Sequence, residues 1–453
     1  MILRLLLILM ILMTPLRPAA AQGGFSLIRD SEIELYLKMW SADVIKNTGL
    51  PPGSVNIILV QSDDINAFVA GGPNIFIYTG LLERSETPEE VIGVIAHELG
   101  HIVGGHLSRG RAAMENASYE TIIGTILGVG AAILSGRGEA AQAVMGAAQN
   151  YALSKYLAHS RVQESSADQA ALGFLDGAKI DPSGLTSFLK KMQSDELLPA
   201  SQQSEYYRTH PVTRNRISAL ESKIIELSAK QYKDNTLWAD QHARMKAKLM
   251  GFIHPQQVAW AYDPAANTIP DTMAYAVAAY RQSNEEQAIE KVRALVRLEP
   301  DNPYYHELAG QILASFGHLG DAEESYQKAH KYMPGDGLIA IAYAHILIER
   351  EKQGESDAKA LQAAIKLLKG AQHSEPRSTR LYRLLATAYG RLKDDSRANL
   401  YLAEESYLKR SMSDTGRLAE MAIRGLKEES REWQRAKDLL FYAEQAKLQK
   451  KNN

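Results

Sequence analysis

Two short apolar runs near the start of the chain, residues 55–61 and 74–79, are rich in β-branched and aromatic side chains. Such runs are typical of strands when turn-forming residues bound them. The turn residues between them are Gly71, Gly72, Pro73 and Asn74. This pattern predicts a small sheet inside a mixed unit that extends from about residue 26 to residue 230.

A helix is predicted clearly from residue 88 to residue 103. Thr87 can cap its N-terminus, Pro88 suits the first helical position, and Glu90 completes a capping box. The positions from 91 to 103 are mostly apolar or small. We therefore expect a buried helix, and it carries the main chemical motif of the chain.

A Gly- and Ala-rich apolar stretch covers residues 121–134, and an Ala-rich helical pattern follows at 140–157. The first stretch is too short to span a bilayer, which takes roughly 20 residues. We interpret it as a buried or lid-forming helix. The alternative is a segment that makes peripheral contact with a membrane or with an apolar partner.

From about residue 267 onward, small residues and prolines recur every 34 positions. Such a period resembles the tetratricopeptide repeat, in which small residues let paired helices pack closely. The residues in register are Ala276, Ala288 and Pro300, then Gly310, Ala322 and Pro334. We expect about four repeats, looser toward Pro376, and a charged C-terminal helix over 415–447. The alternative is a helical bundle with coincidental spacing.

The first 21 residues have the layout of a signal peptide. Arg4 lies in an otherwise apolar run, and Ala19, Ala20 and Ala21 form a small-residue cleavage site. The alternative, an uncleaved membrane anchor, needs a longer apolar run than residues 2–13 supply. We expect cleavage before Gln22 and a location in the periplasm.

Length and composition complete the predicted organisation. A chain of 453 residues is too long for one ordinary core, so two folded domains are expected. We assign residues 1–21 to the signal peptide and 22–230 to the N-terminal domain. A linker follows at 231–266, and the repeat domain covers 267–453. The fold class is mainly α (α+β), with a small sheet followed by an α-solenoid.

Charge and cysteine content exclude several classes of protein. The chain has 51 basic and 53 acidic residues, and removal of the first 21 would leave a net charge of −4. Nucleic-acid partners require a concentrated basic face, which this composition does not suggest. Because cysteine is absent, disulfides, thiolate metal sites and cysteine catalysis are excluded. Any metal must be bound by His, Asp or Glu.

The predicted helix at 88–103 carries a His-Glu-x-x-His motif. His97 and His101 lie one turn apart on the same face, so both imidazoles can bind one ion. Glu98 would lie beside that ion, where a carboxylate can take a proton from metal-bound water. The uncharged flanking residues favour a buried metal site over a coincidental match on a surface helix.

Two histidines leave a catalytic zinc one protein ligand short. The best candidate is Glu164, on a second predicted helix that runs through residues 161–168. Asp168, one turn further, could orient a histidine ligand through its other ring nitrogen. Taken alone, this Glu-x-x-Ala-Asp string also fits an ordinary solvated helix face.

The motifs in combination resemble the gluzincin peptidases related to HtpX and the CAAX prenyl protease, and most closely their secreted branch with tetratricopeptide repeats. This resemblance implies one Zn²⁺ per chain on His97, His101 and Glu164, with Glu98 as catalytic base. It also implies an endopeptidase that acts in assembly and quality control of outer-membrane β-barrel proteins. The motifs are His97-Glu98-Leu99-Gly100-His101, Glu164 with Ala167-Asp168, and Thr209-His210-Pro211 with Arg216.

The resemblance suggests two roles for His210. It could stabilise the oxyanion of the reaction, or it could occupy the open zinc position and hold the enzyme inactive. The alternative is a structural histidine in a loop before a proline. His106 and His159 are weaker candidates, since His106 points about 140° away from His101 around the helix.

The strand at 74–79 is expected to form the edge of the active site, with substrate contacts at Asn74, Ile75 and Phe76. Peptidases of this kind can hold an extended substrate by strand addition. The alternative is a strand that serves only the core.

Three functions remain after these steps. The first is a zinc endopeptidase with possible chaperone-like activity, whose partners are unfolded or stalled outer-membrane proteins and the outer-membrane assembly machinery. The second is an adaptor or chaperone scaffold with a latched zinc site. The third, hydrolysis of a non-peptide substrate, has no feature in its favour beyond general Lewis-acid chemistry.

Overall fold

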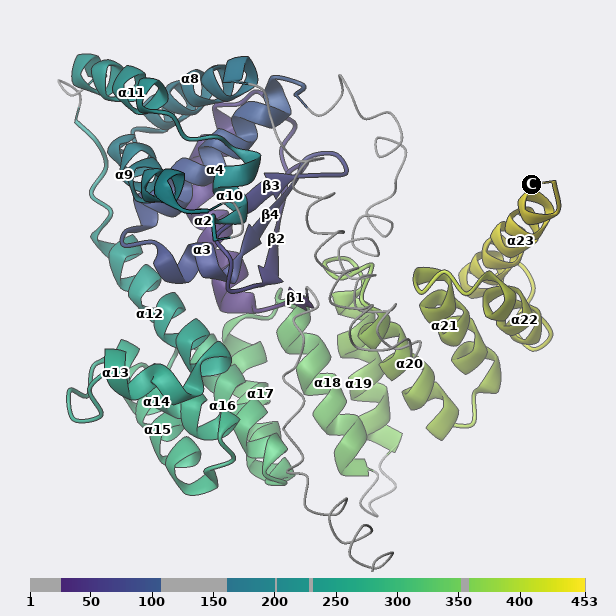
Figure 1. Cartoon of the computed structure of the whole chain (residues 1–453). Coiled ribbons are helices and arrows are strands. Elements are labelled where there is room, and N and C mark those ends of the chain that lie inside the picture. The colour runs from purple at the N-terminus through teal and green to yellow at the C-terminus, as the bar shows by residue number, and fades with distance from the viewer. Residues whose placement is uncertain (1–25, 107–160, 200–201, 228–230, 352–357, 453) are drawn as a thin grey trace, which may run out of the picture.

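The computed structural model describes residues 26–106, 161–199, 202–227, 231–351 and 358–452. The expected signal peptide, the apolar stretch at 121–134, the helical pattern at 140–157 and His159 lie outside these ranges. Within them, the chain forms an N-terminal unit with a small sheet and an arc of helix pairs (Figure 1). This arrangement agrees with the expected mainly helical class with one sheet.

The N-terminal unit contains one four-stranded sheet in the order β1-β2-β4-β3. The parallel pair is β2 with β4, and the two outer pairs are antiparallel. The strands are β1 (Ser26–Ile28), β2 (Asn56–Gln61), β3 (Ala67–Val69) and β4 (Asn74–Tyr78). The helices are α2 (Ser31–Lys46), α3 (Thr79–Arg84), α4 (Pro88–Val103), α8 (Arg161–Ala178), α9 (Ser183–Gln193), η1 (Ser194–Leu197), α10 (Glu205–Thr209) and α11 (Arg214–Leu227).

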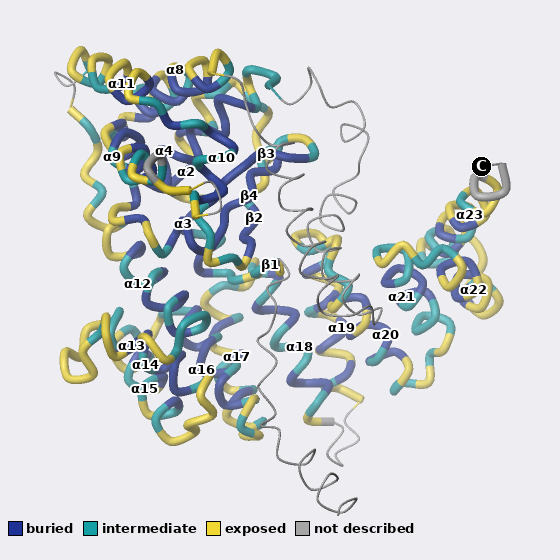
Figure 2. The backbone as a smooth tube through the Cα atoms, in the orientation of Figure 1, coloured by how far each residue is buried: buried dark blue, intermediate teal, exposed yellow. Residues whose placement is uncertain are grey.

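The core of this unit forms where α2 and α4 pack against one face of the sheet. Ile75 and Ile77 of β4 belong to this core, together with Trp40 of α2 and Ile95 of α4. Because side chains alternate along a strand, Phe76 points to the other face, where its ring stacks on Phe68 at 5.0 Å. Figure 2 shows α4 buried along most of its length.

The start of α4 agrees with the predicted cap, except for one hydrogen bond. The Thr87 hydroxyl accepts from the Glu90 backbone N–H, and Pro88 occupies the first turn. The Glu90 carboxylate accepts from the N–H of Glu86 and not from that of Thr87. The helix therefore begins where the sequence predicted, and its buried stretch includes His97, Glu98 and His101.

The segment expected to be a linker, residues 231–266, is largely helical. It contains α12 (Thr236–Ile253), η2 (Pro255–Gln257) and α13 (Val258–Ala261). Met245 and Leu249 of α12 belong to the core of the N-terminal unit, whereas Ala247 belongs to the core of the first repeats. Because α12 buries residues on two faces, its sequence lacks the single apolar stripe that marks an amphipathic helix.

The remaining helices form five antiparallel pairs, and the small residues at the repeat positions are buried as expected. A Cβ on Gly310 would lie 2.6 Å from the Tyr326 ring, so only glycine allows this approach. The single C-terminal helix expected over 415–447 is instead a fifth pair, broken near Gly425. The helices are α14 (Ile269–Arg281), α15 (Glu285–Leu298), α16 (Pro303–Ser315), α17 (Leu319–Tyr332), α18 (Gly337–Glu351), α19 (Ala358–Ala371), α20 (Thr379–Arg391), α21 (Asp395–Leu408), α22 (Met412–Ile423) and α23 (Arg431–Asn452).

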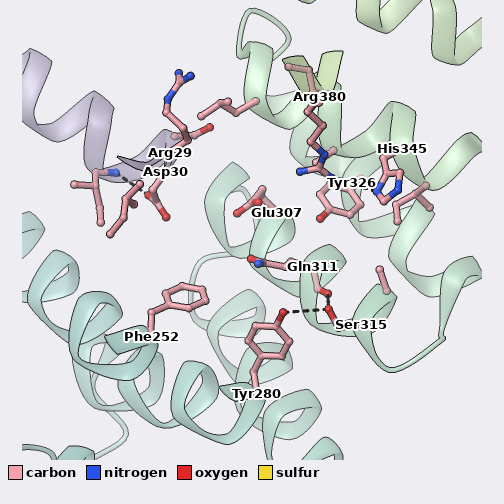
Figure 3. Close-up of a pocket in the computed structure, with 18 of the residues that line it drawn as sticks. Arg29, Asp30, Phe252, Tyr280, Glu307, Gln311, Ser315, Tyr326, His345 and Arg380 are labelled. Carbon is pink, nitrogen blue, oxygen red and sulfur yellow. Dashed lines mark hydrogen bonds between the residues drawn. The ribbon is translucent and has the colours of Figure 1, made fainter. Parts of the chain in front are cut away.

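An ion pair and a hydrogen bond join the N-terminal unit to the repeats beside a cavity of about 1170 Å³. Arg29 pairs with Glu375 at 2.8 Å, and the Ser31 hydroxyl donates to Asp336 at 2.9 Å. Lys248 of α12 lies 2.8 Å from Asp30. Figure 3 shows side chains from the N-terminal unit, α12 and the repeats around the cavity, among them Arg29, Asp30, Phe252, Tyr280, Glu307 and Tyr326.

Candidate active site

Four potential metal ligands from three parts of the N-terminal unit converge at one buried point. They are His97 and His101 on α4, Glu164 on α8, and His210 directly after α10. All four are fully buried. Gly100 allows α4 and α8 to approach closely, because a Cβ at this position would lie only 2.6 Å from the Ala167 carbonyl oxygen. This close approach places the Glu164 carboxylate opposite the two histidines.

The donor atoms of these four residues, including both oxygens of Glu164, are spaced as expected around one metal ion. Zinc bound at 2.0–2.1 Å has ligand atoms about 3.3 Å apart. His97 Nε2 lies 3.0 Å from His101 Nε2, 3.3 Å from His210 Nδ1 and 3.4 Å from Glu164 Oε2. Glu164 Oε1 lies 3.3 Å from His101 Nε2 and 3.1 Å from His210 Nδ1. Three imidazoles and a carboxylate are also the donor types that zinc prefers, so the residues fit the ion.

Asp168 and Arg216 hold these ligands from behind. Asp168 Oδ1 lies 3.0 Å from the second ring nitrogen of His97, where it can orient the imidazole. Arg216 donates two 2.8 Å hydrogen bonds to Asp168 and also reaches Glu164 Oε2 at 2.7 Å. Burial opposes ionisation, yet the bonds from Arg216 and His97 keep the pKa of Asp168 below its usual value.

Arg216 also connects the ligands to the segment that carries His210. Its Nη1 donates a 3.0 Å hydrogen bond to the carbonyl oxygen of Pro211, the residue after His210. In the sequence, Arg216 was recognised only as part of the family pattern, and no role was predicted for it. The signal in the sequence for that role was an arginine five residues after Pro211.

His106 lies nearer the site than its position on an ideal helix implies. Its Nδ1 is 2.9 Å from Nδ1 of His101, the ring nitrogen that faces away from the donor cluster. Residues 104–106 form a turn after α4 ends, so the helical angle of about 140° does not apply there. His106 therefore contacts His101 on the side away from the donor cluster.

Glu98 is buried beside the cluster without belonging to it. Its Oε1 lies 3.4 Å from His210 Nε2, and neither of its oxygens accepts a hydrogen bond from the described residues. Burial raises the pKa of this carboxyl. A carboxylate that borders the metal site without binding the ion is free to exchange protons there.

His210 fills the fourth corner of the donor set through Nδ1. Its ring stacks on Tyr206 of α10 at 4.7 Å, and both side chains are fully buried. His210 therefore lies at the position that a fourth protein ligand of a metal ion would take.

The expectation that the strand at 74–79 forms the active-site edge is wrong. This strand is β4, which pairs with β2 on one side and β3 on the other. The backbone groups of Asn74, Ile75 and Phe76 are therefore not available to a peptide. Within the described residues the strand at that end of the sheet is β3 (Ala67–Val69), which packs against α4.

Replacing Glu164 with Ala is expected to remove most of the bound zinc, because it deletes a ligand. Asp168→Ala should weaken zinc affinity only about 10- to 100-fold, because it removes a partner of His97. Zinc content after dialysis against graded chelator separates the two variants. Equal and full zinc content in both would show that the third ligand lies elsewhere.

Comparisons with known proteins give a match for each of two parts of the chain. Residues 32–224 match the model described as peptidase family M48, and residues 270–422 match a tetratricopeptide repeat model. The β-barrel assembly-enhancing protease of Escherichia coli (strain K12) is 21% identical over 298 residues, which is 64% of this chain and 60% of that protein. The protein of the same name from Yersinia pestis is 23% identical over 374 residues, covering 80% and 73%.

A third relative covers the N-terminal unit alone. Metalloprotease LoiP of Escherichia coli (strain K12) is 28% identical over 172 residues, which is 38% of this chain and 63% of that protein. The chain thus spans less than two thirds of the first relative and of this one. These matches confirm the resemblance to peptidases with tetratricopeptide repeats that the motifs indicated.

Proposed function

We propose that this chain, which carries a peptidase family M48 domain ahead of tetratricopeptide repeats, is a zinc-dependent endopeptidase. The observation that carries the proposal is the buried donor set of His97, His101 and Glu164. Beside it lies the carboxylate of Glu98, which is not one of the potential ligands and accepts no hydrogen bond from the described residues. These three residues would hold one Zn²⁺. When bound, the ion supplies Lewis-acid activation of a water molecule and of the scissile carbonyl.

The residues of the chain would supply the other parts of the reaction. Glu98 takes a proton from the attacking water and returns it to the leaving amine, a task that its raised pKa suits. Asp168 and Arg216 keep His97 and Glu164 in place. The β3 edge would hold an extended substrate through main-chain hydrogen bonds, which select a conformation and not a sequence.

His210 would act as a latch. With its Nδ1 in the donor cluster, it occupies the position that the reactive water needs. Catalysis then requires the ring to leave. The other role predicted for His210, stabilisation of the oxyanion, would instead require the ring in every turnover.

The substrates we propose are unfolded or stalled outer-membrane β-barrel proteins, handled in the periplasm. The names of the relatives support this class. The cavity between the repeats and the N-terminal unit offers a surface for substrates or for the outer-membrane assembly machinery (Figure 3). Within the described residues no helix is both long and apolar enough to cross a bilayer. The peripheral membrane contact predicted through 121–134 remains a prediction.

The latched site also favours a second function, that of an adaptor or chaperone that rarely cleaves. In this form the repeats bind the client and the zinc site stays closed. Cleavage assays on the wild type alone cannot separate the two functions, because both predict low activity at rest.

Metal removal tests the proposed enzyme in a variant whose latch is open. His210→Ala protein should cleave a urea-denatured outer-membrane β-barrel protein, lose that cleavage in a chelator, and regain it with one equivalent of Zn²⁺. The folded β-barrel serves as the control substrate and should resist. Cleavage that persists in the metal-free protein would contradict a zinc mechanism.

A further inference from the structure

The short segment that carries His210 is tied to the loop before the edge strand β3. The Glu205 backbone N–H donates to Asp64 Oδ1 at 3.2 Å, and the Tyr206 N–H donates to the Ile65 carbonyl oxygen at 2.9 Å. One turn later the His210 N–H donates to the Tyr206 carbonyl oxygen at 2.8 Å. The position of the His210 ring therefore depends on contacts between α10 and residues 64–66.

Asn66 is the centre of these contacts. Its side chain is fully buried, and its Nδ2 donates to Glu205 Oε2 at 3.2 Å. Its Oδ1 lies 3.5 Å from the hydroxyl of Thr209, the residue before His210. Its backbone carbonyl accepts from the Tyr78 N–H of β4 at 3.0 Å. One residue thus contacts both ends of α10 and lies directly before β3.

We propose that Asn66 and Glu205 are positioning residues that hold His210 in the metal-ligand cluster and couple its position to the β3 edge. The inference rests on the proposed function, because it concerns how the zinc site is opened. Because Asn66 directly precedes β3, a peptide that paired with β3 would lie beside it. Movement of that residue would weaken the hydrogen bonds at both ends of α10, and His210 would leave the cluster.

The surroundings of Glu205 make this contact sensitive to charge. Asp64 lies on the same side, and burial raises the pKa of both carboxyls. Among the described residues, the other titratable groups that face the pair are Tyr78 of β4, Arg208 of α10 and Asp195 of η1. The amide of Asn66 donates into this acidic group. In Asn66→Asp, a carboxylate oxygen would replace the amide nitrogen that lies 3.2 Å from Glu205 Oε2. The two carboxylates would repel each other and push α10 away.

The test uses a pair of substitutions that reverses the donor and the acceptor. Asn66→Asp removes the donor and adds a charge. In Asn66→Asp/Glu205→Gln the glutamine amide can donate to the new carboxylate, so the pair is restored with its direction reversed. Both substitutions leave the backbone hydrogen bond from Tyr78 to residue 66 in place. Thermal unfolding of each protein shows whether it is folded.

The first readout is amide hydrogen exchange in the metal-free protein at pH 8. Asn66→Asp should speed exchange of the Tyr206 and His210 amides about tenfold or more, as expected for the loss of one buried hydrogen bond to a charged group. The double variant should return toward the wild-type rate. The second readout is the visible spectrum of the Co²⁺-substituted protein, which should change on loss of the His210 nitrogen in Asn66→Asp and revert in the double variant.

These readouts separate failure of the inference from failure of the proposed function. Wild-type exchange rates and a wild-type Co²⁺ spectrum in Asn66→Asp would overturn the inference, whatever the cleavage. A double variant more perturbed than Asn66→Asp would overturn it as well, since no pair would have been restored. Faster exchange that the double variant reverses, without cleavage by any variant including His210→Ala, would support the positioning role and contradict the endopeptidase.

Discussion

Replacing Glu98 with Gln should abolish proteolysis while zinc stays bound. The glutamine amide keeps the size of the side chain but cannot accept a proton, and loss of a general base typically costs about 10²- to 10⁴-fold in rate. Glu98 is not among the converging ligand atoms, so metal content should not fall. The cleavage rate and the zinc content are best measured in the His210→Ala background, because a closed latch there cannot mask the loss of cleavage.

A matched glutamate elsewhere controls for this substitution. Glu86 lies just before α4, and its side chain is exposed. Glu86→Gln should leave cleavage and zinc content unchanged. If Glu98→Gln retains cleavage, Glu98 is not the base. If the Glu98→Gln variant loses zinc, Glu98 also helps to hold the metal site together, although it is not one of the potential ligands.

Replacing His210 with Ala should raise cleavage of unfolded substrate. In the structure its Nδ1 lies within the cluster of potential metal ligands, so removal of the ring should open the site. If the latch leaves the site open between one-tenth and one-hundredth of the time, the gain is about 10- to 100-fold. Initial cleavage rates at subsaturating substrate measure it, with His318→Ala on the repeats as a histidine control.

The opposite result would assign His210 a different role. A loss of about 10²- to 10³-fold would mark an oxyanion donor that is needed in every turnover. An unchanged rate, with zinc bound by water in the resting wild type, would leave His210 as a structural histidine and remove the regulatory account.

Local patterns in the sequence predicted the parts of the site that lie on one helix. Thr87, Pro88 and the apolar frame fixed the start of α4, and the spacing of His97 and His101 placed both on one face. The distance from Asp168 to His97 also follows from helical spacing once Glu164 faces the metal. These relations depend on residues a few positions apart, which a helix places without tertiary information.

Relations between distant segments were predicted less well. The order β1-β2-β4-β3 depends on long-range pairing, and the three residues of β3 are too few to show a strand pattern. For this reason the strand at 74–79 was predicted as the edge strand, whereas the structure has β3 there. The two faces of α12 and the contact of Asn66 with α10 likewise appear only after the chain has folded.

A zinc-edge anomalous diffraction map of the purified wild-type protein tests the central claim most directly. The account predicts one peak at about 2.0–2.2 Å from His97 Nε2, His101 Nε2 and Glu164, with His210 Nδ1 as the fourth ligand. A peak held by other residues, or a fully folded protein with no metal at these four side chains, would contradict it.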